Sequence, residues 1–283
     1  MDSLRKLALS GCSKLKKFPE ILRGTKCLSE LLLDGTDIKE LPLSLQHLPK
    51  LVLLNLENCK KLESLPSEII NGLKHLKTLN LSGCSRLEIV PENMEKVESL
   101  EELNISGTAI RQPAEPSIFL LRNLKALSFR GCKGTAAATS WFSWLSISRS
   151  LDPLGLILPS LSGLSSLKKL DLSDCNLGEG AIPIDICSLF SLEELNLSKN
   201  EFSSLPENIS HLSKLKSLKM VHCKRLQSLP KLPCNINEVR VHGCVSLETL
   251  SDALKSCNSE WIEINCLSCL KLASDNDLAY SML

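Results

Sequence analysis

Aromatic side chains are scarce in this sequence: they make up 4% of its 283 residues, and there is a single tyrosine. Proteins that bind single-stranded nucleic acid stack bases on aromatic rings, and small-molecule pockets use such rings as anchors. The charges also balance, because 33 lysines and arginines stand against 32 acidic residues and leave a net charge of +1. No overall field therefore attracts nucleic acid or an anionic membrane. We expect no nucleic-acid, membrane or small-molecule partner.

Membrane spans and an export signal are missing as well. No apolar run approaches the roughly 18 residues of a transmembrane helix. The first six residues, Met-Asp-Ser-Leu-Arg-Lys, do not form a signal peptide. The hydrophobic content of 43% is nevertheless enough to bury a core. These features predict a globular intracellular protein.

Catalytic signatures are also lacking. The sequence contains no nucleophile-elbow motif, no paired acid/base signature and no glycine-rich phosphate loop. One Cys-x-x-Cys pair, Cys266 and Cys269, has no second pair beside it, so it is a weak indication of zinc or redox chemistry. We expect no enzymatic activity, no metal and no cofactor.

What the sequence does contain is one block, L-x-x-L-x-L-x-x-(C/T/N), that recurs along nearly the whole chain. Successive blocks start 21 to 25 residues apart, except for one spacing of 43. The starts are Leu4, Leu28, Leu51, Leu76, Leu100, Leu124, Leu167, Leu192, Leu215 and Ile236.

Within the block, leucines alternate with polar residues, as Leu79 and Leu81 do with Asn80 and Ser82. This period of two predicts a short strand with its leucines inward. Strands that recur without hairpin turns must lie parallel, with each intervening segment returning on the outside. Prolines after the second leucine pair favour an extended or short helical return. The predicted fold is an α/β leucine-rich-repeat horseshoe of about ten repeats with a parallel inner sheet.

The ninth position of the block predicts the role of most cysteines. A small side chain there turns inward, where its S–H, O–H or amide can bond backbone groups of the turn. Seven of the thirteen cysteines take this position, which fits reduced thiols in a cytosol better than disulfides. This structural ladder comprises Cys12, Thr36, Cys59, Cys84, Thr108, Cys132, Cys175, Asn200, Cys223 and Cys244.

The polar strand positions indicate a candidate binding surface on the concave face. Positive charge gathers toward the C-terminal repeats, in addition to Arg130 on an earlier one. We hypothesise that these residues bind an acidic protein surface, and the alternative is a merely solvated face. The candidate residues are Arg130, Lys216, Lys219, His222, Arg240 and His242.

The 43-residue spacing predicts an inserted loop at about 133–163. An insertion in a solenoid maps to a loop on one face, and Trp141 and Trp144 are candidate interface anchors there. The alternative is that both tryptophans fold back onto the convex side. We assign residues 1–250 to the repeat domain, including this loop, and 251–283 to an end cap and the start of a post-repeat domain.

The detailed repeats resemble a known family. L-x-x-L-x-L-S-G-C-S-x-L-x-x-x-P at Leu4 to Pro19 and Leu76 to Pro91 alternates with L-x-x-L-x-L-x-G-T-x-I-x-x-L-P at Leu28 to Pro42, with a variant at Leu100 to Pro113. This pattern is similar to the repeat domain of plant intracellular nucleotide-binding leucine-rich-repeat immune receptors, in the branch with a Toll/interleukin-1-receptor domain. The segments 160–183 and 265–272 are similar to that branch too, the latter to the start of its post-repeat domain.

The resemblance implies a non-enzymatic recognition module in the cytoplasm or nucleus. Its implied partners are a pathogen effector, a guarded host protein or the receptor's own domains, and it would restrain a nucleotide-binding domain. No G-x-x-x-x-G-K-[ST] loop is present, so we expect a fragment or truncated product that binds but does not switch. Because the first repeat has no polar cap, we expect the isolated chain to be unstable or to aggregate.

Three rival functions follow from the same residues. The first is a cytosolic signalling scaffold without an immune role. The second is a secreted or cell-surface receptor, which would show an asparagine ladder where this chain has only Asn200. The third is an enzyme that cleaves NAD, which would need an N-terminal signalling domain that this sequence does not encode.

Overall fold

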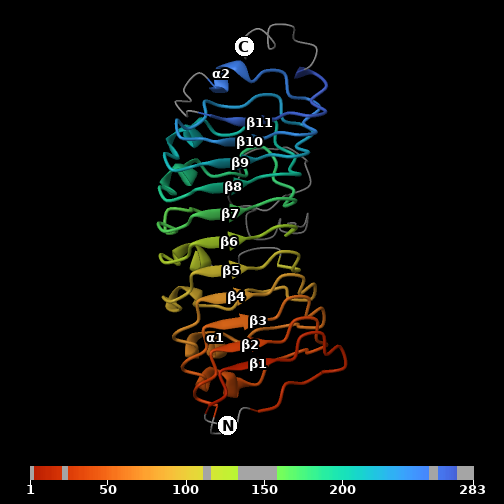
Figure 1. The fold of residues 1–283 in the computed structure, drawn as a ribbon, viewed down its shortest axis with the longest axis vertical. Helices are drawn as coiled ribbons and strands as arrows, with labels where there is room; N and C mark the ends of the chain where they lie inside the picture. The colour runs from red at the N-terminus through yellow and green to blue at the C-terminus, as the bar shows by residue number, and fades with distance from the viewer. Residues whose placement is uncertain (1–2, 21–24, 111–115, 133–157, 255–260, 273–283) are drawn as a thin grey trace, which may run out of the picture. The chain divides into compact units, whose positions relative to one another are not determined.

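The computed structural model describes residues 3–20, 25–110, 116–132, 158–254 and 261–272. They form two compact units, which are considered separately: 3–132 with 163–167, and 158–162 with 168–272. Both are built from the same coil, in which a three-residue strand is followed by a turn and a return segment (Figure 1).

The first unit stacks its strands in chain order, and each pair of neighbours is parallel. The fourth block position keeps the same register throughout, so Leu31, Leu54, Leu79, Leu103 and Leu127 lie side by side. The strands of this unit are β1 (Lys6–Ala8), β2 (Glu30–Leu32), β3 (Leu53–Asn55), β4 (Thr78–Asn80), β5 (Glu102–Asn104) and β6 (Ala126–Ser128).

The second unit repeats this arrangement, with Leu195 in the corresponding position. Its strands are β7 (Lys169–Asp171), β8 (Glu194–Asn196), β9 (Ser217–Lys219), β10 (Glu238–Arg240) and β11 (Glu263–Asn265). The last strand differs from our expectation, because β11 pairs in parallel with β10 inside the range that we assigned to an end cap and a post-repeat domain. The repeat pattern thus extends past residue 250.

Each strand is short because the chain turns at the eighth block position. The residue there is left-handed, with φ of 72° at Gly83 and 56° at Asn58. A left-handed residue cannot continue a strand. Neighbouring turns also lie close together, since a Cβ on Gly83 would be 2.3 Å from Oδ1 of Asn58. Glycine is therefore the residue that best fits this position.

The return segments begin at prolines, as the sequence predicts. Pro42, Pro66, Pro183 and Pro206 directly precede a short helix, and each is extended. Proline fits this position because its φ is fixed near the required value. Its missing N–H group is not needed there, since the first N–H groups of a helix have no partner within the helix. The helices are η1 (Leu43–His47), α1 (Ser67–Gly72), η2 (Met94–Lys96) and η3 (Pro116–Leu120) in the first unit, and η5 (Ile184–Ser188), η6 (Glu207–His211) and α2 (Ser251–Leu254) in the second. In the described residues no helix has the length and apolar content of a membrane span.

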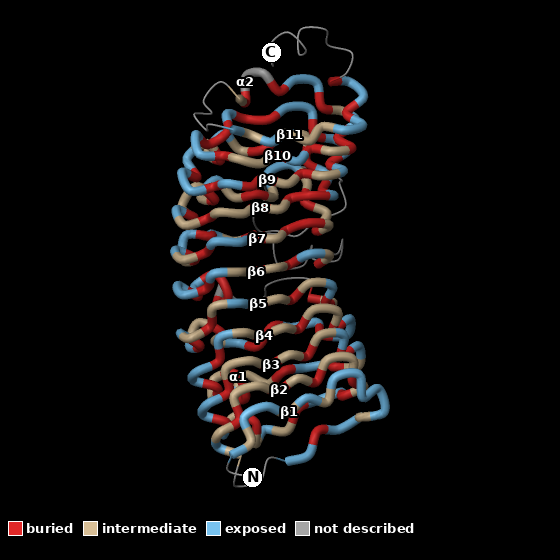
Figure 2. The backbone as a smooth tube through the Cα atoms, in the orientation of Figure 1, coloured by how far each residue is buried: buried red, intermediate tan, exposed pale blue. Residues whose placement is uncertain are grey.

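The core lies between the strands and the return segments of each coil (Figure 2). Leucines at block positions one, four and six are almost completely buried, as Leu76, Leu79 and Leu81 are in the fourth repeat. The first repeat is the exception, because Leu7 and Leu9 are only half-buried. A repeat therefore completes its core only against neighbours on both sides.

The ninth-position side chains bond backbone across the coils. The thiol of Cys84 donates to the carbonyl of Leu56 in the preceding repeat, with 3.1 Å between sulfur and oxygen. The thiols of Cys59 and Cys132 likewise each donate to a carbonyl of the preceding repeat. The hydroxyl of Thr36 instead donates to Leu33 of its own repeat, at 2.8 Å, and lies 3.3 Å from the sulfur of Cys59. The ladder thus gives buried carbonyls of the turn a side-chain donor, and the carbonyl of Leu56 accepts the backbone N–H of Cys59 as well.

Asn200 makes the most bonds of any ladder residue in the described chain. Its Nδ2 donates to the carbonyls of Leu172 and Leu197 at 2.9 and 2.8 Å, and more weakly to Ser198. Its Oδ1 accepts from the backbone N–H groups of Cys175 and Leu177 at 3.1 and 3.0 Å. One amide therefore connects two repeats as both donor and acceptor, and its NH₂ group offers two N–H donors where a thiol has one weak S–H.

Burial keeps the thiols of Cys84 and Cys269 protonated at neutral pH. Desolvation raises the pKa of Cys84 to about 12 and that of Cys269 to about 11. Cys269 also donates to the carbonyl of Val241, so it is an eleventh ladder residue. The Cys266–Cys269 pair thereby takes the sixth and ninth positions of a repeat, which accounts for its spacing.

Two expectations are corrected, namely the burial of Cys12 and the end of the inserted loop, and the position of the two tryptophans stays a prediction. Cys12 was expected inside, but it is exposed, because no described coil covers the outer side of β1. The end of the expected loop is buried coil, since Leu158 and Leu161 are inside and a Cβ on Gly163 would meet the carbonyl of Phe119 at 2.2 Å. Trp141 and Trp144 lie outside the described residues.

We predict that Asn200→Ala destabilises the chain far more than Cys84→Ala. The first change leaves several buried backbone groups unpaired, each costing about 1–3 kcal/mol, so we expect a loss above about 3 kcal/mol. The second removes one net hydrogen bond, worth about 1 kcal/mol. Denaturant unfolding of both variants measures the difference, and equal losses would contradict the bridging role of Asn200.

We also predict that stability falls as the pH rises from 8 to 10. In the unfolded chain a thiol ionises near its ordinary pKa of about 9, whereas the folded Cys84 ionises only near 12. The stabilisation is complete below about pH 9 and is lost as the pH rises toward 12. By pH 10 one such thiol accounts for about 1 kcal/mol. Unfolding of Cys84→Ala across the same range should show a smaller decline, and an identical decline would refute the assignment.

Candidate protein-interaction surface

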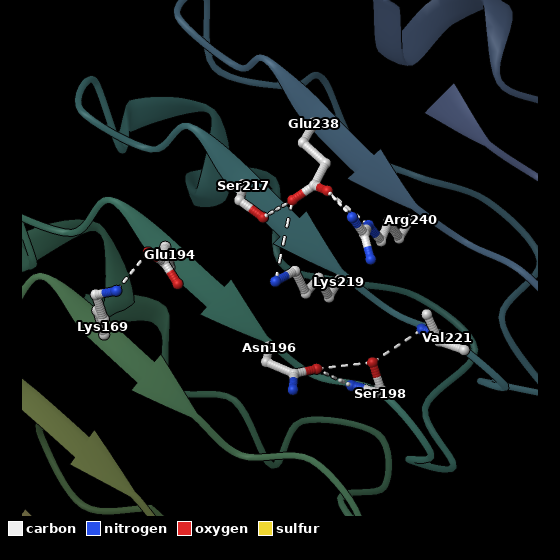
Figure 3. Close-up of polar contacts among 9 residues, drawn as sticks. All are labelled: Lys169, Glu194, Asn196, Ser198, Ser217, Lys219, Val221, Glu238 and Arg240. Carbon is white, nitrogen blue, oxygen red and sulfur yellow. Dashed lines mark hydrogen bonds and ion pairs between the residues drawn. The ribbon is translucent and has the colours of Figure 1, made fainter. Parts of the chain in front are cut away.

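The outward face of the strands is built from block positions three, five and seven. In the second unit, Oδ1 of Asn196 accepts from the backbone N–H of Ser198 at 3.2 Å and from its hydroxyl at 2.7 Å (Figure 3). The same serine oxygen accepts from the backbone N–H of Val221 at 3.0 Å. Such bonds hold side chains of neighbouring repeats in place and give the face a defined pattern.

A row of alternating charges runs beside this face at block position two. In the first unit Glu101 lies 2.9 Å from Lys77 and contacts Lys125 at 2.5 Å. Hydrogen bonds from Lys125 and Lys77 lower the pKa of Glu101 to about 2. In the second unit Glu193 bridges Lys168 and Lys216 at 3.2 and 2.9 Å. Pairs this exposed contribute little to stability, but they decide which charges remain available.

Glu238 is the centre of the candidate surface in the second unit. Its carboxylate accepts hydrogen bonds from the hydroxyl of Ser217 and from Nε of Arg240, the latter at 2.6 Å (Figure 3). Nζ of Lys219 lies 4.0 Å from Oε2 of the same carboxylate. The bond from Ser217, together with Arg240 and Lys219, lowers the pKa of Glu238. The carboxylate is therefore ionised at neutral pH and paired with two cations.

This arrangement corrects the predicted basic patch. The register does place Lys219 beside Arg240, but Glu238 lies between them and compensates their charge. Lys216 lies at position two, where it pairs with Glu193. The predicted patch left out Glu238 at position three, which points the same way as position five because a strand has a period of two. The surface is thus mixed in charge rather than simply basic.

The two histidines of the patch do come together. The ring centroids of His222 and His242 are 5.1 Å apart, and the rings meet edge to face at an interplanar angle of 69°. His222 takes the left-handed turn position with φ of 59°, and a Cβ on Gly243 would be 2.2 Å from its Nδ1. Nδ1 of His242 is buried and has no hydrogen-bond partner among the described residues. Arg130, in the first unit, is an exposed residue two positions after the end of β6.

Comparison with known proteins identifies this repeat. A family model described as RPS4B-like disease resistance protein leucine-rich repeats matches residues 1–91 and 88–272. The chain belongs to this family. Its curated relatives include the disease resistance-like protein DSC1 of Arabidopsis thaliana, 42% identical over 79% of this chain, and the TMV resistance protein N of Nicotiana glutinosa, 39% identical over 88%. RPP2B of Arabidopsis thaliana is 42% identical over 90%.

These relatives are plant disease resistance proteins of the Toll/interleukin-1-receptor branch, as the resemblance implied. The chain spans only 17% to 20% of the length of the three proteins. It is therefore a leucine-rich-repeat module of the disease-resistance type, and the activities of the longer proteins are not thereby assigned to it.

Solved structures show the same fold. A leucine-rich-repeat protein of Leptospira interrogans matches with a TM-score of 0.56 and 24% identity, covering 93% of this chain and 72% of its own. An internalin of Listeria monocytogenes matches with a TM-score of 0.52 and 15% identity, over 96% and 85%. At this identity the likeness shows the fold alone. The predicted leucine-rich-repeat solenoid with a parallel inner sheet is confirmed.

We predict that Glu238→Gln exposes a cationic site that the native surface masks. Removing the carboxylate charge leaves Lys219 and Arg240 without their partner, so the variant should elute from a cation exchanger at higher salt than the native chain. Glu207→Gln is the matched control, because it removes the same charge from an exposed helix position. Equal elution of the two variants would contradict the masking.

Proposed function

We propose that this chain is the recognition module of a plant resistance receptor, acting in the cytoplasm or nucleus without catalytic activity of its own. It senses a pathogen effector or a guarded host protein and restrains a nucleotide-binding domain. Family membership supports the setting, because the relatives are named for disease resistance. The strand face supports a protein partner, because it offers polar groups that neighbouring side chains hold in place.

The observation that carries this proposal is the Ser217–Glu238–Arg240–Lys219 network. It holds two cations and a carboxylate in place before a partner arrives, which reduces the entropy lost on binding. Arg240 contacts Glu238 through Nε and one terminal nitrogen, and its guanidinium has further N–H donors to offer a partner. The surface therefore fits a protein with both acidic and hydrogen-bonding groups better than a purely acidic one.

The chain can restrain a nucleotide-binding domain if one surface binds either that domain or an external protein. An external protein that takes the same residues as the nucleotide-binding domain would shift the population toward the released state. The required difference in affinity is set by charge complementarity, since a wrong partner would bring like charges together. Arg130 would contribute to such a surface on the first unit.

A binding screen with a charge-reversed variant tests the proposal. The native chain is screened by surface plasmon resonance against purified effector proteins and nucleotide-binding domains, at physiological salt. We expect at least one protein to bind and to lose tenfold or more affinity when Lys219 and Arg240 are both changed to Glu. Lys214→Glu with Lys231→Glu is the control of equal charge at exposed positions. The assigned surface would be refuted if the proteins that bind lose affinity with neither pair of substitutions, or lose it to the same extent with both pairs.

A further inference from the structure

A groove in the first unit lies beside the strands, away from positions three, five and seven. It has a volume of about 510 Å³ and is lined by residues from five successive repeats. Four of them share block position two, and the other four come directly before a block. The lining residues are Arg5, Cys27, Ser29, Lys50, Val52, His75, Lys77 and Ser99.

The backbone of this groove is already satisfied. The carbonyl of Val52 accepts from the N–H groups of Lys77 and Thr78 at 2.8 and 3.0 Å, and that of Ser29 accepts from Val52 and Leu53. The hydroxyl of Ser99 donates to Leu76 at 2.8 Å. A ligand would therefore be recognised by side chains rather than by addition of a strand.

The side chains of the groove carry one sign of charge. Within the described residues, Lys77 pairs with Glu101, whereas Arg5 and Lys50 have no carboxylate partner. Lys26 and Lys74, next to Cys27 and His75 in sequence, are exposed as well. Val52 adds an apolar surface in the middle of this row. Such a combination is complementary to carboxylates that alternate with apolar side chains.

The length of the groove indicates the form of the ligand. Neighbouring strands are about 4.8 Å apart, so the four steps between five repeats cover roughly 19 Å. An extended chain advances about 3.3 Å per residue and needs about six residues for that length. A free phosphate or a small carboxylic acid would reach only one or two of the cations.

We propose that this groove binds an extended acidic peptide segment of a partner protein, about six residues long. Carboxylates of the segment pair with Arg5, Lys50 and His75, while an apolar side chain packs on Val52. Lys77 marks the end of the site, because Glu101 already holds it and would repel a further carboxylate. This site shares no residue with the Glu238 network, so an experiment can refute one of the two assignments and leave the other standing.

Synthetic peptides test the site. Eight-residue peptides with two to four glutamates at different spacings, and counterparts with glutamine at those positions, are titrated against the 283-residue chain by fluorescence anisotropy. We expect one or more glutamate peptides to bind at least tenfold more tightly than their glutamine counterparts, and this preference to weaken as salt is raised. A single-stranded oligonucleotide of the same charge should bind more weakly.

Charge reversal in the groove locates the binding. Changing Arg5 and Lys50 to Glu should weaken the best peptide at least tenfold, whereas the exposed pair Lys214→Glu and Lys231→Glu should leave it unchanged. Circular dichroism checks folding, and Lys50→Gln with His75→Gln replaces the double reversal if that variant unfolds. The proposal is overturned if no glutamate peptide binds, if glutamine peptides or the oligonucleotide bind equally well, or if both variant pairs lose affinity alike.

Discussion

Each repeat depends on its neighbours because three-residue strands hold too few hydrogen bonds to persist alone. The ladder side chain joins one coil to the next: a thiol or an amide donates to a buried carbonyl of the preceding repeat, as Cys84 does to Leu56 and Asn200 does to Leu172. This contact and the leucine at position four join the same pairs of repeats, so polar satisfaction and burial require the same register. Shifting a strand by one residue would lose both.

The same register determines the outer surface. Because leucine and the ladder occupy the inward positions, a partner meets the side chains at the remaining positions, whose neighbours are about one repeat away in sequence. Lys77, Glu101 and Lys125 are each 24 residues apart and form one ionic row. Pairing of this kind is local, yet it decides which charges a partner meets. The network around Glu238 and the cationic groove beside β1 to β4 are two outcomes of the same geometry.

Membership of the disease-resistance family gives these surfaces a setting. The chain covers a fifth or less of its named relatives, so the repeats that it matches are one part of a much longer architecture in those proteins. In a solenoid, a change at an outward position alters one repeat's surface without disturbing the core behind it. Surfaces can then differ between relatives that keep the same leucines and ladder.

The sequence alone determined the parallel strands, the inward leucines, the proline-led returns and the ladder, because each follows from a pattern that recurs about every 24 residues. It did not reveal that Cys12 is exposed, since the ladder pattern is the same whether or not another coil covers the residue. Nor did it show that β11 continues the stack, because Trp261 and Ile264 depart from the leucine pattern. Tertiary structure alone decided the charge of the candidate site: Glu238 and Arg240 lie on one strand and Lys219 on the next, and only their distances reveal that the cations are compensated.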